Sequence, residues 1–382
     1  MNISKRAQQI TQSEIRAMTI LCNKVNGINM AQGLCDLKVP DVVQTGAKEA
    51  IEMGKNVYTS ALGEPYLRAA IGETLTRNYG RKIEAGNVLV SNGATGALYC
   101  LATTLFDEGD EIILFEPYYG YHVSTLESLG CKIKYLKTLP PNYEIDFDKL
   151  EDAISEKTRA ILICNPSNPS GKVFSKEEMS RLAEIVGKND IYLISDEIYE
   201  HFVYDGLAFT SALSLQAIKE RVIAISGFSK IFSVTGWRIG YAICDESIIS
   251  AASEVNDLVY VCPASPLQYG VNQGIKYLPK QYYTDVARDH QQKRDTFIST
   301  LNEVGLAADY VKGAYYVLAD LSSLPGDDDK EKVLYLLKKT SIASVPARAF
   351  FSDPNGINLA RFCFSKKEEE LEEACRRLRK NL

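Results

Sequence analysis

The sequence lacks the features that mark nucleic-acid-binding and membrane proteins. Lysine and arginine total 43 against 49 aspartates and glutamates, so the net charge is −6 and no basic excess is available for a phosphate backbone. The charge-free stretch 258–275 contains prolines, glycines and amides, which make it a poor membrane span. The first 18 residues carry no apolar signal core. We therefore expect a cytoplasmic protein that handles small molecules, with no nucleic-acid or membrane partner.

No C-x-x-C spacing occurs, although the chain has nine cysteines. Their odd number and their wide separation argue against a disulfide framework and against a zinc cluster, so we predict no metal site. Several lie in apolar runs, among them Cys164 and Cys244, where cysteine behaves as a small hydrophobe. Unpaired cysteines are typical of a reducing compartment, which agrees with a cytoplasmic location.

Internal repeats and low-complexity linkers are also absent, and what is present is a strand–helix rhythm. A helical pattern at 175–188 begins at a serine N-cap, with acids in its first turn and bases in its last. This alternation predicts a mostly parallel sheet covered by helices. Little helix separates the last two strand-like runs, which allows one strand to run antiparallel. The strand-like runs, mostly β-branched, lie at 87–91, 111–115, 131–136, 159–164, 191–195, 221–226 and 238–244.

The two ends of the chain differ from this middle part. A helix is predicted at 64–79, with a proline in its first turn and Gly80 after its end. Beyond residue 280 the patterns predict a long polar helix, two strands and two further helices. We expect an α/β fold, with a mostly parallel sheet sandwiched by helices and a smaller α+β domain. The predicted parts are an N-terminal arm at 1–45, a large domain at 46–280 and a small domain at 281–382; the late elements are a helix at 281–304, strands at 313–321 and 357–365, and helices from Asp329 and Lys366.

Two charged residues beside strand ends could form a reactive site. Lys230 lies on a Gly/Ser-rich turn with apolar neighbours, where desolvation would lower the pKa of the amine and make it a nucleophile toward an aldehyde. Asp196 ends a buried run at the sheet edge where open α/β folds bind ligands. There it can keep a heteroaromatic nitrogen protonated. The plainer alternatives are a solvated loop lysine and an aspartate that caps the next turn.

Two turns add polar groups at that edge. In SNGATG, small residues begin a helix and expose backbone N–H groups to a phosphate, and Arg238 could add a cation. The dinucleotide spacing G-x-G-x-x-G is absent. In NPSNPSGK, Asn168 could donate to a phenolate oxygen. Either segment could also be only a turn.

Taken together, NPSNPSGKVF, SDEIY and SGFSKIFSVTGWRIGY resemble the class I/II aminotransferases of pyridoxal-phosphate fold type I. The resemblance covers nearly the whole chain. The segments EPYYGYH, VYVCPASP, KGAYYVLADLSSL and RFCFSK are similar to the kynurenine aminotransferase/glutamine transaminase K branch.

The resemblance implies pyridoxal 5′-phosphate as cofactor and matches five residues to contacts with its ring and its aldehyde. Lys230 matches the lysine that binds the cofactor aldehyde and later moves the proton. Asp196 matches the partner of the ring nitrogen. Asn168 and Tyr199 match the pair that hydrogen-bonds the 3′ oxygen, and Tyr119 matches the aromatic ring stacked on the cofactor.

The resemblance also implies the phosphate and substrate contacts. Tyr58 matches a tyrosine that reaches the phosphate of a neighbouring subunit, which implies a homodimer with shared active sites. Arg361 matches the arginine that grips the substrate α-carboxylate, with Gly33 and Asn168 beside it. The residues that match the phosphate cup are Gly93, Ala94, Thr95, Ser229 and Arg238.

Two positions depart from the family pattern. Many relatives have serine where this chain has Gly227, so the phosphate cup is expected to lose one hydroxyl. Many also read Pro-Gly-x-x-Phe-Gly at 346–351, where Arg348 stands here. We expect Arg348 to be solvated or ion-paired rather than a substrate ligand. His122 is a possible substrate neighbour, for which a structural role is the preferred interpretation.

We therefore predict an aminotransferase that moves an amino group between an L-amino acid and a 2-oxo acid by ping-pong kinetics. An aromatic-lined pocket would favour aromatic, sulfur-containing or glutamine-like side chains over dicarboxylates. Alternatives are a C–S β-lyase or a cyclising enzyme on the same scaffold, a cofactor-sensing regulator, and a nucleotide-binding oxidoreductase. Tyrosines in segments that could line the pocket are Tyr58, Tyr118, Tyr119, Tyr121 and Tyr315.

Overall fold

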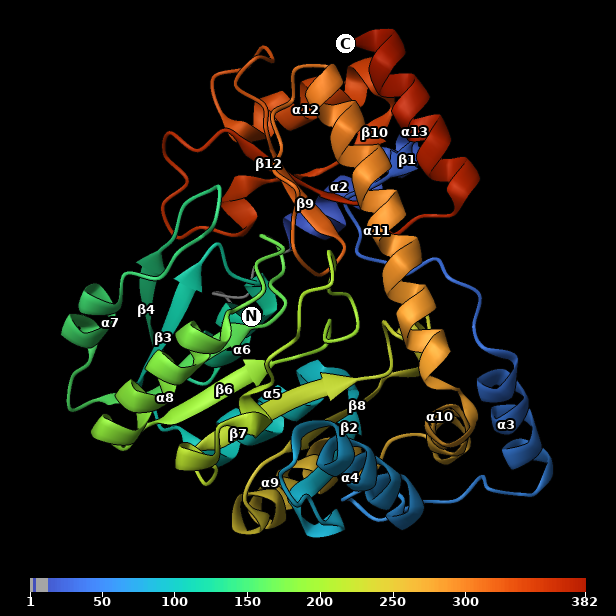
Figure 1. Cartoon of the computed structure of the whole chain (residues 1–382), viewed down its shortest axis with the longest axis vertical. Helices are drawn as coiled ribbons and strands as arrows, with labels where there is room; N and C mark the ends of the chain where they lie inside the picture. Colours follow the sequence, from blue (N-terminus) through green and yellow to red (C-terminus); the bar gives the residue numbers. More distant parts are fainter. Residues whose placement is uncertain (1–2, 5–12) are drawn as a thin grey trace.

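A seven-stranded sheet forms the centre of the computed structural model, which describes residues 3–4 and 13–382 (Figure 1). The strand order is β2-β8-β7-β6-β5-β3-β4. This confirms the predicted α/β class with a mostly parallel sheet. The strands are β2 (Val88–Asn92), β3 (Glu111–Glu116), β4 (Lys132–Lys137), β5 (Thr158–Cys164), β6 (Tyr192–Asp196), β7 (Val222–Gly227) and β8 (Ile239–Ile243).

Strand β8 is the antiparallel member that the short β7–β8 connection allowed. It pairs antiparallel with both β2 and β7, with Asn92 opposite Ile239 and Gly227 opposite Gly240. Because it runs in reverse, β8 begins at the edge where the parallel strands end. Arg238, just before β8, therefore lies at the same edge as Asp196 and the turn that carries Lys230. The close approach of β7 and β8 explains why residue 227 is a glycine, since a Cβ there would lie 2.8 Å from the Gly240 Cα.

Both faces of the sheet are covered by apolar layers. Alternate strand residues such as Leu89 and Ile112 join one buried cluster, and Val88 and Ile113 join the other. Strands buried on both faces read as continuous hydrophobic runs, which is why they were recognisable in the sequence. Helices α5, α6 and α9 contribute to the first layer, and α4, α8 and α10 to the second: α4 (Pro65–Tyr79), α5 (Gly93–Leu105), α6 (Gly120–Ser128), α8 (Lys176–Asn189), α9 (Glu246–Tyr260) and α10 (Ser265–Tyr277).

Local signals fixed several helix ends as expected. Ser175 caps α8 by accepting from the Glu178 N–H, and the Glu178 side chain accepts from the Ser175 N–H in return. Helix α4 ends at Gly80, whose φ of 69° lies in the left-handed region that glycine adopts without strain. The remaining helices of the large sheet are α3 (Asp41–Glu52), which packs on α10, and α7 (Phe147–Ala153).

A second, antiparallel sheet of order β11-β12-β9 packs with the C-terminal helices (Figure 1). The N-terminal segment packs with this part of the chain through a separate two-stranded parallel sheet, in which β1 (Ile28–Asn29) pairs with β10 (Ile342–Ala343). The boundaries proposed for arm, large and small domains stay predictions, and residues 1–2 and 5–12 of that arm lie outside the described residues. The elements here are α2 (Glu14–Lys24), β9 (Tyr316–Asp320), β11 (Val345–Pro346), β12 (Leu359–Cys363), α11 (Lys280–Glu303), α12 (Asp329–Thr340) and α13 (Glu368–Asn381).

In the described part of the chain, every helix is too short or too polar to cross a bilayer.

Candidate active site

The carboxyl ends of the parallel strands open onto a cavity of about 360 Å³. Asp196 at the end of β6, together with Asn168 and Lys230 in the loops after β5 and β7, lines its wall, although these residues are far apart in the sequence. Open α/β sheets bind ligands at this edge. Of the residues that the sequence predicted, those lining the cavity are Gly33, Ala94, Thr95, Tyr119, Tyr121, Asn168, Asp196, Tyr199, Ser229, Lys230, Arg238 and Arg361.

Lys230 presents a partly enclosed amine to the cavity. Its Nζ donates to the Gly33 carbonyl oxygen at 3.1 Å and lies 6.0 Å from the centre of the Tyr315 ring. Burial lowers the pKa of this amine, because the apolar surroundings disfavour the charged form. A lysine that loses its proton more readily is a better nucleophile and a better proton acceptor.

Asp196 is held by a histidine whose role the sequence left open. The His122 Nε2 lies 2.8 Å from the Asp196 Oδ2, and the Ile198 N–H donates to the other carboxylate oxygen at 3.2 Å. The Tyr119 ring packs at right angles to the His122 imidazole, with centroids 5.2 Å apart. Both Asp196 and His122 are buried. The contact fixes the carboxylate, which agrees with the structural role preferred for His122.

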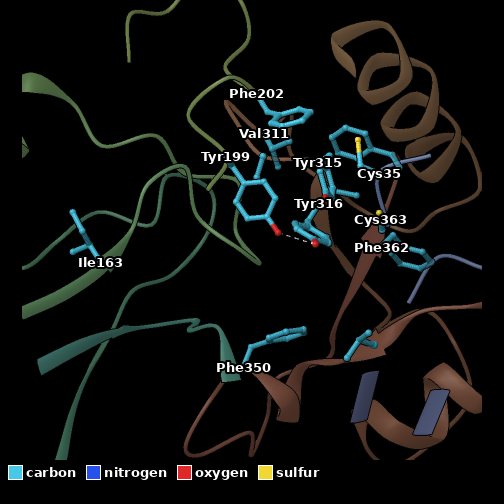
Figure 2. Close-up of a cluster of buried hydrophobic side chains, with 14 of the residues drawn as sticks. Cys35, Ile163, Tyr199, Phe202, Val311, Tyr315, Tyr316, Phe350, Phe362 and Cys363 are labelled. Atoms are coloured by element: carbon cyan, nitrogen blue, oxygen red, sulfur yellow. Dashed lines mark hydrogen bonds between the residues drawn. The ribbon is translucent and has the colours of Figure 1, made fainter. Parts of the chain in front are cut away.

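Tyr199 belongs to a cluster of aromatic rings that includes Tyr315 and Tyr316 (Figure 2). Its hydroxyl lies 3.0 Å from the Tyr316 hydroxyl, along the dashed line in Figure 2. The Tyr315 ring packs edge-on against it at 5.1 Å. The sequence analysis named Tyr315 but missed Tyr316. Strand alternation was the available signal, since neighbouring residues of β9 face opposite sides.

Arg361 lies in the middle strand of the small sheet and reaches across to the large sheet. Its Nη1 donates to the Asn168 Oδ1 at 2.9 Å and its Nη2 to the Ala31 carbonyl oxygen at 2.5 Å. The guanidinium lies 4.3 Å from the centre of the Tyr316 ring. Its Nε is buried with no hydrogen-bond partner in the described residues. A buried donor without a partner is costly, so this one is suited to a ligand that accepts from it.

The first turn of α5 faces the same cavity. Gly93 begins the helix with φ of 75°, and a Cβ there would collide with the Arg238 guanidinium. A Cβ on Gly240 would overlap the backbone at Ala94. These contacts bring the arginine against the helix N-terminus, where free N–H groups and the helix dipole favour an anion.

The donor set fits pyridoxal phosphate. The helix N-terminus with Arg238 suits the phosphate, and the buried Asp196 carboxylate suits a protonated ring nitrogen. The Asn168 Oδ1 is engaged by Arg361, which leaves the amide N–H groups for an oxygen. Lys230 supplies the amine for an aldehyde.

Other predicted residues lie elsewhere. Tyr58 is 82% exposed in this single chain and does not line the cavity. Tyr118 lines a small neighbouring cavity instead. Arg348 is ion-paired, with its Nη2 at 2.8 Å from Asp328 and 2.5 Å from Asp329, which confirms the expectation for it. Residues that the sequence analysis did not single out, such as Ile15 and Arg16, also line the cavity.

Sequence and structure comparisons agree with this chemistry. The family model for aminotransferase class I and II matches residues 25–378. The chain therefore belongs to the class I and II aminotransferases, and like members of that family it is a pyridoxal-phosphate-dependent enzyme that acts on amino and 2-oxo acids.

Individual relatives match nearly the whole length of the chain. A methionine aminotransferase of Escherichia coli is 31% identical over 95% of this chain and 94% of its own. A kynurenine–oxoglutarate transaminase of Dictyostelium discoideum is 29% identical over 97% of this chain and 94% of its own. The solved structure of an E. coli methionine aminotransferase superposes with a TM-score of 0.95, 30% identity and full coverage of both chains. An aspartate aminotransferase from Thermus thermophilus, solved with maleate, gives 0.93, 28% and full coverage of both chains.

Proposed function

We propose that the cavity at the carboxyl edge of the large sheet is the transamination site, with Lys230 as its nucleophile and proton carrier. The observation that supports this best is the convergence of a partly enclosed amine, a fixed carboxylate and a buried arginine on one cavity. The cofactor, when bound, supplies an aldehyde for the amino group and an aromatic ring that stabilises negative charge.

Each protein group then has a defined task. Arg361 binds the substrate α-carboxylate as a bidentate fork, which orients the Cα–H bond. Lys230 accepts the proton from the α-carbon as a general base. The His122-bound carboxylate of Asp196 accepts a hydrogen bond from a protonated ring nitrogen. Tyr199 and Asn168 donate to the 3′ oxygen, and Tyr119 packs on the ring.

The remaining predicted contacts concern the phosphate. We assign it to the backbone N–H groups and side chains of the first turn of α5, together with the residues before β8. Arg238 supplies the charge, and Ser229 a hydroxyl next to Lys230. Gly227 supplies none, so this cup has one hydroxyl fewer than that of many relatives. The residues of the cup are Gly93, Ala94, Thr95, Ser229 and Arg238.

For the amino donor we propose an aromatic, sulfur-containing or glutamine-like amino acid. Four tyrosines line the cavity, and aromatic walls favour polarisable or aromatic side chains. The relatives named for methionine and kynurenine act on side chains of these kinds. The tyrosines are Tyr119, Tyr121, Tyr199 and Tyr316.

An absorbance scan tests transamination directly. Purified enzyme with pyridoxal phosphate is mixed with single amino acids and no 2-oxo acid. We expect the band of lysine-bound cofactor to give way to that of pyridoxamine phosphate, for some amino acids only. Release of pyruvate with the original band restored would instead indicate a β-lyase, and an unchanged spectrum with every amino acid would contradict the proposal.

We also propose that the enzyme is a homodimer. Val57 and Tyr58 are 73% and 82% exposed, and Leu258 is 86% exposed. The Thr59 N–H donates to the Cys262 Sγ at 3.3 Å, so these two segments are neighbours and form one apolar patch. An exposed patch of this kind is typical of a protein interface.

The patch lies close to the phosphate end of the cavity. Tyr260, two residues after Leu258, packs against Gly96 of α5. A Cβ built at Gly96 would lie 3.4 Å from the Tyr260 ring. The first turn of the same helix belongs to the proposed phosphate cup. A second copy on this patch could place its Tyr58 beside the phosphate, and two-fold closure is the common solution.

Sedimentation of a Leu258→Asp variant tests the dimer. We expect it to shift toward monomer and lose activity, because the charge would be buried without a partner. Leu139→Asp is the matched control, since Leu139 is also exposed, at 59%, on another segment. A dimeric, active Leu258→Asp enzyme would contradict this assembly.

A further inference from the structure

Two buried amide side chains hold the segment that carries Tyr58. This segment, residues 58–64, is an irregular stretch that ends where α4 begins, and we call it the Tyr58 segment. Asn256 of α9 and Gln268 of α10 bind it and are fully buried, whereas Tyr58 itself is exposed in the single chain. Burying an amide costs free energy unless its hydrogen bonds are made. An exposed aromatic ring therefore stands on a backbone that costly polar groups fix in place.

Gln268 binds the Tyr58 segment near both of its ends. Its Nε2 donates to the Thr59 Oγ1 at 3.2 Å, and its Oε1 accepts from the Glu64 N–H at 2.8 Å. The Nε2 also donates to the Pro263 carbonyl oxygen at 2.9 Å, just before α10. Gly63 packs closely here, since a Cβ on it would lie 3.2 Å from the Gln268 Oε1. The backbone directly after Tyr58 is thereby fixed relative to α10.

Asn256 joins the Tyr58 segment to the strand that precedes the proposed phosphate cup. Its Nδ2 donates to the Ala61 carbonyl oxygen at 2.7 Å, and its Oδ1 accepts from the Ser91 hydroxyl at 2.7 Å. Ser91 is buried near the end of β2, two residues before Gly93. A Cβ at Gly96 of α5 would lie 3.0 Å from the Ser91 Oγ. One amide therefore contacts the Tyr58 segment on one side and the strand leading into the cup on the other.

The active-site cavity gives these amides no direct role. Neither Asn256 nor Gln268 is among the described residues that line it. A backbone hydrogen bond from the Val90 N–H to the Leu62 carbonyl oxygen, at 3.0 Å, already ties the segment to β2. Apolar side chains of the same shape would fill this space at little cost. Directional hydrogen bonds instead select one backbone position, as a residue requires when it must meet a ligand with its geometry set in advance.

We propose that Asn256 and Gln268 are positioning residues that hold Tyr58 for the phosphate bound in the partner subunit. This proposal rests on the proposed function, in which two copies share their sites and Tyr58 crosses to the neighbouring one. Gln268 holds only the Tyr58 segment, so it acts on the partner's site. Asn256 acts on both sites, because Ser91 connects it to the cup of its own subunit.

The test measures affinity for pyridoxal phosphate in mixed dimers that have one working site. Two differently tagged subunits, one native and one Lys230→Ala, are coexpressed and purified by both tags. Only the native subunit can form the band of lysine-bound cofactor, so titrating the cofactor into the apoenzyme reports on that site without turnover. A second substitution in the Lys230→Ala subunit alters the Tyr58 segment that this site receives and leaves the site's own cup native.

The expected losses in this arrangement differ between the variants. Tyr58→Phe should weaken the affinity roughly tenfold, because one charge-assisted hydrogen bond to the phosphate is lost. Gln268→Met, which keeps the side-chain volume, and Asn256→Ala should each weaken it roughly threefold to tenfold. Ser91→Ala is the matched control, since it removes a buried partner of Asn256 on the side of the other cup. It should change the affinity less than about twofold.

The reverse arrangement places each substitution in the subunit whose site is measured. There Asn256→Ala and Ser91→Ala should weaken the affinity, and Gln268→Met should not. A double variant adds a test that general destabilisation would not pass. In the first arrangement, Gln268→Met should add no further loss to Tyr58→Phe, because both remove the same contact.

Two results would overturn the proposal. A loss with Tyr58→Phe but none with Gln268→Met or Asn256→Ala would show that Tyr58 needs neither amide. An equal loss with Ser91→Ala in the first arrangement would show a general loosening of the subunit. If Asn256→Ala gives no folded dimer, Gln268→Met decides alone. Failure of the proposed function differs from both, because Tyr58→Phe would then leave the affinity unchanged, and the shared site would fall together with this proposal.

Discussion

The two halves of the cavity are built in different ways. The half proposed for the cofactor is made of residues that directly follow strands of one sheet or begin a helix, so neighbouring backbone hydrogen bonds set their positions. The half proposed for the substrate carboxylate combines Gly33 of the N-terminal segment, Arg361 of β12 and Tyr316 of β9. Arg361 reaches the Ala31 carbonyl across 330 residues of sequence.

This difference separates the residues proposed to carry out the reaction from those proposed to select the substrate. A side chain at a strand end is held by the sheet itself and can keep a reactive geometry. A site assembled from the N-terminal segment and a second sheet depends on how these parts pack, so its shape can vary between relatives while the reactive half is kept. The predictions below test this separation, from the largest expected effect to the smallest.

Lys230→Ala should have the largest effect, because it removes both the nucleophile and the proton acceptor. We expect turnover to fall roughly a thousandfold or more, with the fold retained. The absorption band of lysine-bound cofactor should disappear, while circular dichroism stays native. Substantial residual transamination would contradict the role of Lys230 and with it the assignment of the reactive half.

Arg361→Gln tests the carboxylate half. Loss of a buried bidentate pair should lower kcat/KM by roughly a hundredfold, for every amino acid alike. Cofactor binding, measured by dialysis and absorbance, should change little. If cofactor affinity fell as much as substrate affinity, the two halves would not be separable.

Gly33→Ala probes the packing between Gly33 and Tyr316. A Cβ at Gly33 would collide with the Tyr316 hydroxyl, so we expect a cost of about 1–3 kcal/mol, measured by urea unfolding. Tyr316→Phe removes that hydroxyl, and the double variant should recover part of the loss. Equal losses in the single and double variants would mean that the hydroxyl is not the obstacle.

The smallest expected effect is a dependence of protein stability on pH that arises from His290. His290 on α11 is buried, with its Nε2 at 2.9 Å from the Ser365 hydroxyl, and burial lowers its pKa from 6.5 to about 4. Between these values the unfolded chain binds the proton and the folded chain does not, so stability falls as pH drops from 6.5 to 4. Between pH 6.5 and 5.5 the expected loss of stability is about 1 kcal/mol.

The measurement for His290 is urea unfolding at several pH values across that range. His290→Gln should show a shallower decline with falling pH than the native protein, even if it is less stable throughout. The charged neighbours of His290, Asp289 and Lys293, are present in both proteins. The same pH slope in both would contradict the depressed pKa.

Much of the reactive half followed from local patterns. Hydrophobic runs predicted the strands that end at Asp196 and before Lys230, and the Ser175 cap and Gly80 predicted helix ends. The role of each residue came from resemblance to a family, not from spacing. The sequence patterns also allowed the reversed strand β8 but could not show that it would bring Arg238 to the same edge.

Other contacts needed the tertiary structure. The sequence by itself determined where many helices and strands begin and end, because periodicity, capping and turn preference act over a few residues. It did not determine that His122 meets Asp196, that Tyr316 meets both Tyr199 and Arg361, or that residues of α2 line the same cavity. Those contacts join segments far apart in the chain, and only the packing of two sheets and their helices brings such segments together.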